Sequence, residues 1–392
     1  MKFETILAEE LIEEISMGPF GSNIKKECFT DTGVAVLNGS NLIGYALNED
    51  SFGYITEEKA DSLGKANASR GDVIITHRGT LGQAVFIPQN STRDRYVISQ
   101  SQFRIRCNEK ILPEYMVYYL HTPLGQHKLL ANASQVGVPA LGRPTSTFKT
   151  ITIDVPDVKT QKAIVEFLEL LRLKIENNNK INRNLEEQAK TLYKHMIIEA
   201  ADAKWEDGIL SDIAIIIMGQ SPKGDTYNED GKGEVFYQGR GEFGNRFPNR
   251  RLYTTEPKKM AEVNDVLMSV RAPVGDLNVA YEKCCIGRGL GAIRSKDNHQ
   301  SFVLYTAFYL QDALNIYNGE GTIFGSINKD SLNRMSILIP PANVIDEFEK
   351  IASNIDRIVK KNYEENCRLI DLRDIILPKL MFGELDVSTI NI

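Results

Sequence analysis

The stretch DVIITHRGTLGQ, residues 72–83, has a second version further along the chain, DVLMSVRAPVGD, residues 265–276. Both versions place Asp, Val, Arg and Gly at matching positions, and both begin with an apolar run of strand length. Such a run is typical of a buried β-strand, and the Gly that follows the Arg permits a tight turn. The repeated element is therefore interpreted as a strand that delivers an Arg to a loop.

Further pairs of matching residues surround these two stretches. They occur in the same order in both halves of the chain: Met17-Gly18 with Met218-Gly219, Leu37-Asn38-Gly39 with Tyr237-Gln238-Gly239, Tyr119-Leu120 with Tyr309-Leu310, and Pro156 with Pro340. Each match is weak when taken alone, but a shared order over more than a hundred residues favours an internal duplication.

Composition is that of an ordinary globular protein, with 392 residues, 42% hydrophobic and 25% charged. No apolar run approaches the ~18–20 residues of a membrane helix, and the acidic N-terminal segment does not resemble a signal peptide. The five cysteines are odd in number and show no CxxC spacing, which favours a reducing, cytoplasmic location and predicts no metal site.

The formal net charge of −6 does not exclude nucleic acid, because binding depends on where the cations lie. Segments 1–156 and 205–340 have the same balance, each with 15 Lys and Arg against 17 Asp and Glu. This equality is a second indication of duplication.

Each copy is followed by a long stretch in which apolar residues recur on a seven-residue grid. No Pro or Gly falls between Lys159 and Ile197, so a helix of about 38 residues is predicted there, and a second follows Pro341. A surface helix of each domain is the alternative, but such helices usually have ~10–14 residues. The grid favours an antiparallel pair, with polar Asn178 and Asn182 fixing its register. The predicted seam comprises Ile164, Leu168, Leu171, Ile175, Leu185 and Leu192 in the first helix and Ile351, Ile355, Ile358, Leu369, Leu372 and Ile376 in the second.

The two domain bodies have the pattern of α+β units. In the first, short β-rich runs at 33–37, 73–77, 96–98 and 103–106 are separated by Gly, Asn and Pro turns, and a short helix is predicted at 113–121.

These features together resemble the specificity (S) subunit of Type I restriction-modification systems, over essentially the whole chain. Residues 205–213 (WEDGILSDI) with 218–222 (MGQSP) resemble the start of that family's second recognition domain, and residues 71–82 resemble its central strand. Residues 155–163 (VPDVKTQKA) resemble the start of its first conserved helix, and residues 372–385 (LRDIILPKLMFGEL) the end of the second. The second helix departs from the pattern because it begins without the glutamine.

The resemblance implies an α+β fold with two tandem target-recognition domains, related by a pseudo-twofold axis and separated by a long antiparallel two-helix coiled coil. The expected segments are a first recognition domain at 1–156, a first helix at 157–200, a second domain at 201–340, and a second helix with a tail at 341–392. The implied partners are double-stranded DNA, two methylation subunits and restriction subunits. S-adenosylmethionine, ATP and Mg²⁺ are expected on those partners, with no cofactor in this chain.

If two similar domains read different half-sites, shared residues should hold the framework or phosphates, and differing residues should read bases. Arg78 and Arg271 fall in the shared class; a phosphate contact and a buried salt bridge to Asp72 or Asp265 are about equally favoured. Candidates in the first domain are Asn38, Ser40, Asn41, Arg78, Thr80, Gln83, Gln100, Gln102, Arg143, Thr145 and Ser146. Those in the second are Gln220, Ser221, Lys223, Gln238, Arg240, Asn245, Arg246, Asn249, Arg250, Arg251, Arg271, Arg288, Asn328 and Lys329.

The segment 237–253 is the most cation-rich of these, with four Arg among Gln, Asn and Gly. Arg pairs with guanine, and Asn or Gln with adenine, so the segment is suited to groove reading; a solvated loop is the alternative. The matching place in the first domain holds Asn and Ser, which predicts a different, A·T-richer half-site.

No catalytic motif of the P-loop or HExxH kind is present, so we expect a recognition subunit rather than an enzyme. Two rival hypotheses are a duplicated nuclease or transferase that uses Asp72 with Arg78 and Asp265 with Arg271, and a coiled-coil scaffold that binds only proteins.

Overall fold

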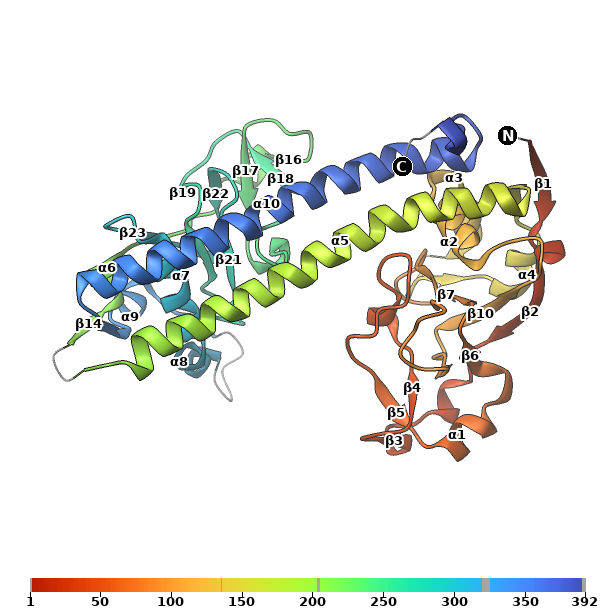
Figure 1. Ribbon diagram of the computed structural model, residues 1–392, viewed down its shortest axis with the longest axis horizontal. Helices are drawn as coiled ribbons and strands as arrows, with labels where there is room; N and C mark the ends of the chain where they lie inside the picture. The colour runs from red at the N-terminus through yellow and green to blue at the C-terminus, as the bar shows by residue number, and fades with distance from the viewer. Residues whose placement is uncertain (1, 135, 203–204, 319–324, 390–392) are drawn as a thin grey trace. The chain divides into compact units, whose positions relative to one another are not determined.

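The structure, a computed structural model, describes residues 2–134, 136–202, 205–318 and 325–389. The chain forms two compact units, of which unit 1 combines Met1–Glu176 with Asn366–Ile392 and unit 2 is Asn177–Glu365. The division falls inside both long helices, α5 (Val158–Tyr193) and α10 (Ala342–Met381), so each unit contains part of each helix (Figure 1). The compact units are therefore not successive blocks of sequence.

The body of unit 1 is built from two larger sheets and two strand pairs. An antiparallel four-stranded sheet has the order β2 (Ile12–Met17), β10 (Gln102–Cys107), β7 (Asp72–Thr76), β8 (Ala84–Phe86). A five-stranded sheet has the order β3 (Phe29–Thr30), β5 (Gly53–Ile55), β4 (Val34–Val36), β9 (Arg95–Val97), β6 (Asn67–Ser69), with β4 and β9 parallel. The pairs are β1 (Phe3–Leu7) with β13 (Thr152–Pro156), and β11 (Ala133–Ser134) with β12 (Ala140–Leu141). The helices are α1 (Glu57–Ser62), α2 (Pro113–His121), α3 (Pro123–Leu130) and α4 (Pro144–Lys149).

Unit 2 repeats this topology strand for strand in its two larger sheets. The four-stranded sheet has the order β15 (Ala214–Met218), β23 (Leu290–Ser295), β20 (Val266–Ser269), β21 (Leu277–Val279). The five-stranded sheet has the order β16 (Tyr227–Asn228), β18 (Leu252–Thr254), β17 (Glu234–Tyr237), β22 (Cys284–Ile286), β19 (Met260–Ala261), with β17 and β22 parallel. The remaining elements are β14 (Glu206–Ile209) paired with β24 (Ser336–Ile339), α6 (Leu210–Ile213), α7 (Gln300–Tyr309), α8 (Gln311–Leu314) and α9 (Lys329–Asn333).

The repeated stretch forms the central strands β7 and β20, and its apolar run is explained by burial on both faces. Val73 and Ile75 pack toward the helices, whereas Ile74 between them packs toward the five-stranded sheet. In unit 2, Val266 and Met268 likewise pack toward the helices, and Leu267 between them packs toward the five-stranded sheet. Because successive strand residues point to opposite faces, only a continuous apolar run can fill both cores. The duplicated α+β fold predicted from the sequence is confirmed.

The buried Asp at the start of β7, and the one directly before β20, are each held by an Arg from the neighbouring strand. Asp72 lies opposite Arg106 of β10, whose Nε is 3.0 Å from its Oδ1. Asp265 binds Arg294 of β23, with Nη2 2.7 Å from its Oδ2. The repeated Asp therefore belongs to the framework.

The two long helices pair antiparallel within each unit. In unit 1, Ile164 and Leu168 of α5 share a core with Leu377 and Leu380 of α10. In unit 2, Asn182 of α5 accepts a 2.8 Å hydrogen bond from Asn362, and its own Nδ2 donates to the carbonyl of Val359 over 3.2 Å. Asn178 donates to Glu365 over 2.8 Å. The polar grid residues thus set the register, as expected.

Three residues of the seam predicted for the second helix are wrong, because Ile351, Ile358 and Leu372 are exposed. At two of these places the next residue, Ala352 or Val359, is buried instead. The reason is that α10 carries two neighbouring apolar stripes, and the prediction followed the one with larger side chains. The other predicted seam residues are buried or half-buried: Ile164, Leu168, Leu171, Ile175, Leu185, Leu192, Ile355, Leu369 and Ile376.

The glutamine of the first helix motif fixes α5 to unit 1. Gln161 is buried, its Oε1 accepts from the backbone N–H of Leu112, and its Nε2 donates to the carbonyls of Lys110 and Pro156. In α10, which lacks the glutamine, the Glu349 carboxylate accepts from the N–H groups of Ser301 and Phe302 at the start of α7. A different side chain thus joins the second helix to the corresponding helix of unit 2.

Candidate nucleic-acid interface

In unit 1 the sheets bring loops that are far apart in the sequence to one edge. Met17 at the end of β2 pairs with Phe103, and Thr76 at the end of β7 pairs with Gln102, so the loops that follow both strands meet the loop that precedes β10. A further segment joins them because Gly79 N–H donates to the carbonyl of Pro139 over 2.8 Å. We call this edge, residues 18–23, 38–41, 77–83, 99–101 and 139–146, recognition edge 1.

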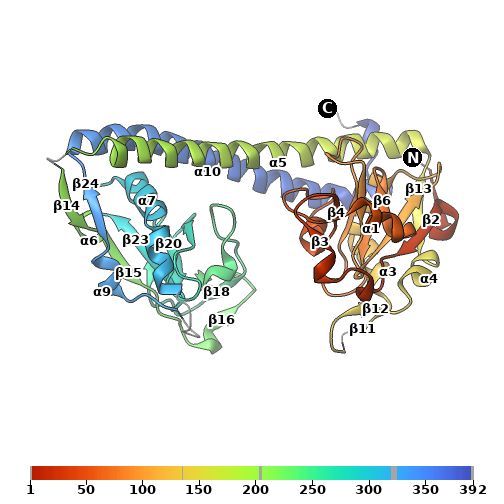
Figure 2. The same ribbon diagram turned by 90° about the horizontal axis from the view of Figure 1, so that it is seen from below.

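Unit 2 has the same edge, built from the corresponding loops. Met218 at the end of β15 pairs with Gly291, and Ser269 at the end of β20 pairs with Leu290. Ala272 N–H donates to the carbonyl of Gly325 over 2.8 Å, which adds the segment before α9. Recognition edge 2 is residues 219–223, 238–242, 270–276, 287–289 and 325–329. Figure 2 shows β11 and β12, which flank recognition edge 1, at the end of unit 1 remote from α5.

Most of the residues proposed from the sequence gather on these edges with exposed or half-buried side chains. On edge 1 they are Asn38, Ser40, Arg78, Thr80, Gln83, Gln100, Arg143, Thr145 and Ser146, and on edge 2 they are Gln220, Ser221, Lys223, Gln238, Arg240, Arg271, Arg288, Asn328 and Lys329. Their contact with DNA stays a prediction. Two of them also cap short helices, since Asn38 accepts from Ser40 N–H and Asn328 from Ser331 N–H.

Two predicted DNA contacts on the first domain are wrong because the side chains are buried. Asn41 donates both amide hydrogens to backbone carbonyls, those of Asn48 and Ser51, and so holds the 38–51 loop together. Gln102 accepts from Ser99 N–H and lies inside the sheet edge. Neither amide has a face available to a base.

The Arg-rich segment 237–253 is largely neutralised by carboxylates. Arg246 is 8% exposed and pairs with Glu186 of α5, at 2.9 Å, and with Asp356 of α10, so its predicted DNA contact is wrong. Arg240 pairs with Asp276, Arg250 with Glu282 and Arg251 with Glu242, although these three Arg side chains remain exposed. Asn245 and Asn249 are exposed. Arg246 therefore attaches the segment to the two long helices, and the other three arginines pair within the body of unit 2.

Arg78 and Arg271 occupy matching places, each just beyond the central strand, and both are exposed. The salt-bridge alternative is wrong, because Asp72 is engaged by Arg104 and Arg106, and Asp265 by Arg294. The same finding removes the enzyme hypothesis in which each Asp acts together with the following Arg. The glycines beyond these two arginines, Gly82 and Gly275, have φ values of +85° and +97°, which the tight turn requires.

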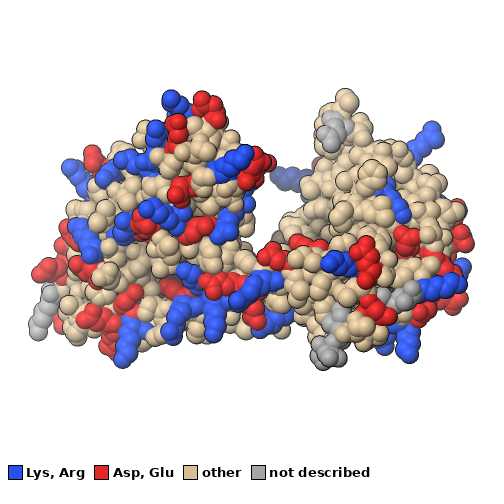
Figure 3. All heavy atoms as spheres, turned by 90° about the horizontal axis from the view of Figure 1, so that it is seen from above, with Lys and Arg blue, Asp and Glu red and all other residues tan. Residues whose placement is uncertain are grey.

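The two edges differ in charge. On edge 2, Lys223, Arg271, Arg288 and Lys329 have exposed side chains for which no ion pair with a described residue is found. On edge 1 the corresponding exposed cations are Arg78 and Arg143. Figure 3 shows cations and anions interspersed over the visible surface of unit 2, whereas much of the visible surface of unit 1 carries no charged residue.

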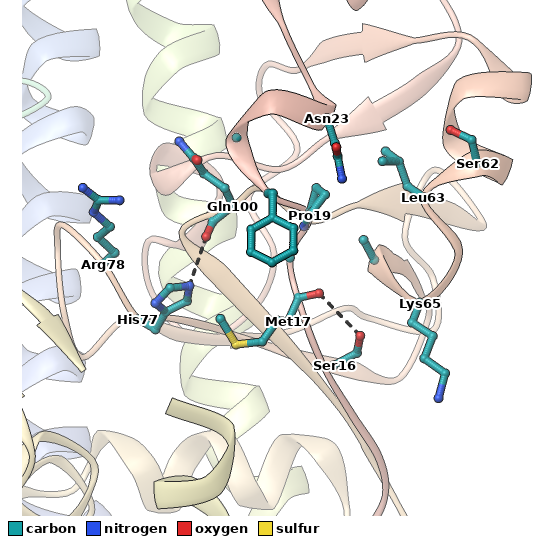
Figure 4. A pocket seen from close by; sticks show the side chains of 14 residues that line it. Ser16, Met17, Pro19, Asn23, Ser62, Leu63, Lys65, His77, Arg78 and Gln100 are labelled. Atoms are coloured by element: carbon teal, nitrogen blue, oxygen red, sulfur yellow. Dashed lines mark hydrogen bonds between the residues drawn. The ribbon is translucent and has the colours of Figure 1, made fainter. Parts of the chain in front are cut away.

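A cavity of about 530 Å³ opens on edge 1. Figure 4 shows His77, Arg78 and Gln100 along one side of it and Ser62, Leu63 and Lys65 along the other. Burial lowers the pKa of His77, whose Nε2 lies 3.0 Å from the carbonyl oxygen of Gln100, so the ring is uncharged near neutral pH. The cavity also includes Phe20 and Lys65, which were not predicted; a Phe between Gly18 and Gly21 was the signal in the sequence.

Within the described ranges, no group of three or more His, Cys, Asp or Glu side chains is placed to hold a metal ion. None of the helices in the same ranges is long and apolar enough to cross a membrane.

Comparisons with known proteins agree on one family. The model of the Type I restriction modification DNA specificity domain matches twice, at residues 18–187 and 203–370. A putative type I restriction enzyme MjaX specificity subunit of Methanocaldococcus jannaschii is 28% identical over 358 residues, covering 86% of this chain and 84% of the relative. The HindI specificity subunit of Haemophilus influenzae is 21% identical, covering 82% and 88%. A crystal structure of an S subunit from M. genitalium shares the fold, with TM-score 0.58, 17% identity and coverage of 97% and 96%.

Proposed function

The chain belongs to the family of Type I restriction-modification specificity subunits, and we propose that it reads a bipartite, asymmetric DNA target with an unread gap. In this proposal each recognition edge reads one half-site, and the chain directs two methylation subunits and the restriction subunits to that target. It has no catalytic role of its own. S-adenosylmethionine, ATP and Mg²⁺ bind to the partner subunits.

The observation that carries the proposal is a recognition edge formed twice with different side chains. The framework is shared down to the buried Asp of each central strand and the exposed Arg beyond it. The surrounding side chains differ, with Asn38 and Ser40 at the place that Gln238 and Arg240 occupy in unit 2. A homodimer would have to read a palindrome, whereas one chain with two unlike edges can read two unlike half-sites.

Arg78→Ala and Arg271→Ala are expected to weaken binding to all duplexes by a similar factor. Each exposed guanidinium would neutralise a phosphate, which carries no sequence information. Gel shifts of the complex with its methylation subunits should show that the slope of log K against log salt falls by ~0.9 for each variant. Lys110→Ala is the matched control, because Lys110 is exposed just beyond the opposite end of β10. A change of sequence preference with an unchanged slope would instead assign the residue to base reading.

The exposed apolar stripes of the long helices fit partner subunits. In unit 1 they comprise Leu170 and Leu173 of α5 with Leu372 and Ile375 of α10, and in unit 2 Ile181 of α5 with Ile351 and Ile358 of α10. Apolar side chains repeated along one exposed helix face are typical of helix-to-helix association. We propose that each stripe binds a helix of one methylation subunit, which would account for two such subunits per chain.

Ile375→Asp and Ile358→Asp are each expected to remove one of the two methylation subunits. Ile375 is 60% exposed, so the change should leave the fold intact while placing a charge inside the helix interface. Native mass spectrometry of co-expressed complexes measures the stoichiometry. Ile215→Asp, on an exposed face of β15, is the control and should retain both subunits. Retention of both by either helix variant contradicts the proposed stripe.

A further inference from the structure

Phe20, on recognition edge 1, is 83% exposed, more than any other aromatic side chain among the described residues. It lies in the loop that follows β2, at the edge of the four-stranded sheet. Phe20 also lines two adjacent cavities, the one of about 530 Å³ beside Arg78 and another of about 210 Å³ that includes Asn38. The ring is therefore the most exposed aromatic group on an edge whose other exposed side chains, apart from that of Pro139, are polar.

Close packing of the adjacent glycines holds the loop in place. A Cβ on Gly18 would lie 1.9 Å from the carbonyl oxygen of Ser99, and one on Gly21 would lie 2.1 Å from Oε1 of Gln100. The N–H of Gly18 donates to the carbonyl of Gln102 over 2.8 Å, and that of Asn23 to the carbonyl of Phe20 over 2.8 Å. Because the backbone is already ordered, contact through the ring would cost little conformational entropy.

The aromatic residue is not part of the duplicated framework. Met17-Gly18 is repeated as Met218-Gly219, but the residues that follow are Pro19-Phe20 in one copy and Gln220-Ser221 in the other. Positions that differ between otherwise matching edges are those that can distinguish two half-sites. Phe20 belongs to that class, whereas Arg78, which has Arg271 as its counterpart, does not.

We propose that Phe20 is a specificity-determining residue that contacts the C5-methyl group of a thymine in the first half-site. This inference rests on the proposed function. The thymine methyl is the one apolar group that a base pair presents in the major groove, and a Phe ring is one of the side chains that can contact it. Cytosine, which lacks the methyl group, would leave the ring against a polar base edge. Arg78 and Gln100, which line the same cavity, are placed to bind the phosphate and base edges beside that thymine.

The test begins with the chain in complex with its methylation subunits and with methylation mapping of host DNA, which defines both half-sites. Binding is then measured on duplexes in which each thymine of the first half-site is replaced in turn by deoxyuridine, which removes only the methyl group. Loss of one methyl contact should weaken binding about fourfold at one position, which is ~0.8 kcal/mol for a buried methyl-sized group. The Phe20→Ala variant should bind the unmodified target ~10-fold more weakly than the unaltered chain does. For this variant, deoxyuridine at that position should weaken binding no further.

Phe20→Leu keeps an apolar contact and should retain part of the thymine preference, whereas Leu7→Ala, an exposed apolar truncation on β1, should bind as the unaltered chain does. If methylation mapping defines both half-sites but no deoxyuridine substitution has an effect that depends on Phe20, the inference is overturned and the proposed function stands. If Phe20→Ala weakens binding equally to all DNA sequences, the ring acts as a wedge between bases. If the variant loses methylation subunits, the ring contacts protein. Either result overturns it. Absence of any sequence-specific methylation would overturn both proposals.

Discussion

Inserting one heptad into both long helices should abolish recognition of the original target and create a target with a wider gap. The insertions belong between Glu176 and Asn177 in α5 and between Glu365 and Asn366 in α10, where the two units divide. Seven residues lengthen a helix by ~10.5 Å and preserve the seven-residue seam. That length equals about three base pairs at ~3.4 Å each. Successive base pairs of duplex DNA are also rotated about its axis, which limits the spacings that present both half-sites. The gap should therefore grow by at least one and at most about three base pairs.

The size of the effect follows from the number of half-sites that can be bound at once. On the original target the lengthened chain could engage only one half-site, and specific binding exceeds non-specific binding by ~10³ or more. Methylation of the original site should therefore fall at least ~100-fold, and mapping should show unchanged half-sites with a new gap. The same heptad inserted in the exposed turn at Gly231-Lys232 is the control and should leave the gap unchanged. An unchanged gap in the helix variant would show that the helices do not set the spacing.

The central strands were predictable because their pattern is local. Val73, Ile74 and Ile75 are all apolar since both faces of β7 are covered, and Gly82 follows since the turn needs a positive φ. The same information occurs twice in the chain, which allowed the duplication to be found from weak matches. Helix length was predictable for a related reason: no Pro or Gly interrupts residues 159–197.

The candidate site was less predictable because partners from distant segments decide which side chains are available. The cations of segment 237–253 are visible in the sequence, but Glu186 and Asp356, which bury Arg246, come from the two long helices. The Asn41 amide is of a type that can read bases, but in the fold it donates to the carbonyls of Asn48 and Ser51. The buried face of α10 was predicted wrongly for a similar reason. Two adjacent apolar stripes have the same periodicity, and only packing decides which of them is buried.

Asp72→Ala is expected to destabilise unit 1 by ~3–5 kcal/mol, whereas the matched change Asp265→Ala should cost unit 2 only ~1–2 kcal/mol. Asp72 is buried and accepts from Ser69 N–H at 2.9 Å, from Arg106 at 3.0 Å and from Arg104 at 3.4 Å. The Arg104 side chain is only 3% exposed, so without Asp72 it retains Glu14, at 2.7 Å, as its one carboxylate partner. The Arg294 side chain, which binds Asp265, is 35% exposed and can turn to water instead.

Hydrogen exchange measures this difference, because the two units need not unfold together and a single unfolding free energy would not separate them. In Asp72→Ala, the amides of β7 and β10 should exchange faster by about two to four orders of magnitude, with β20 and β23 unaffected, which follows from ~3–5 kcal/mol. Asp72→Asn keeps an acceptor for Ser69 but removes the charge, so it should give an intermediate acceleration. Equal effects of Asp72→Ala and Asp265→Ala would contradict the argument, since the main difference between the two sites is the second, buried Arg104 that binds Asp72.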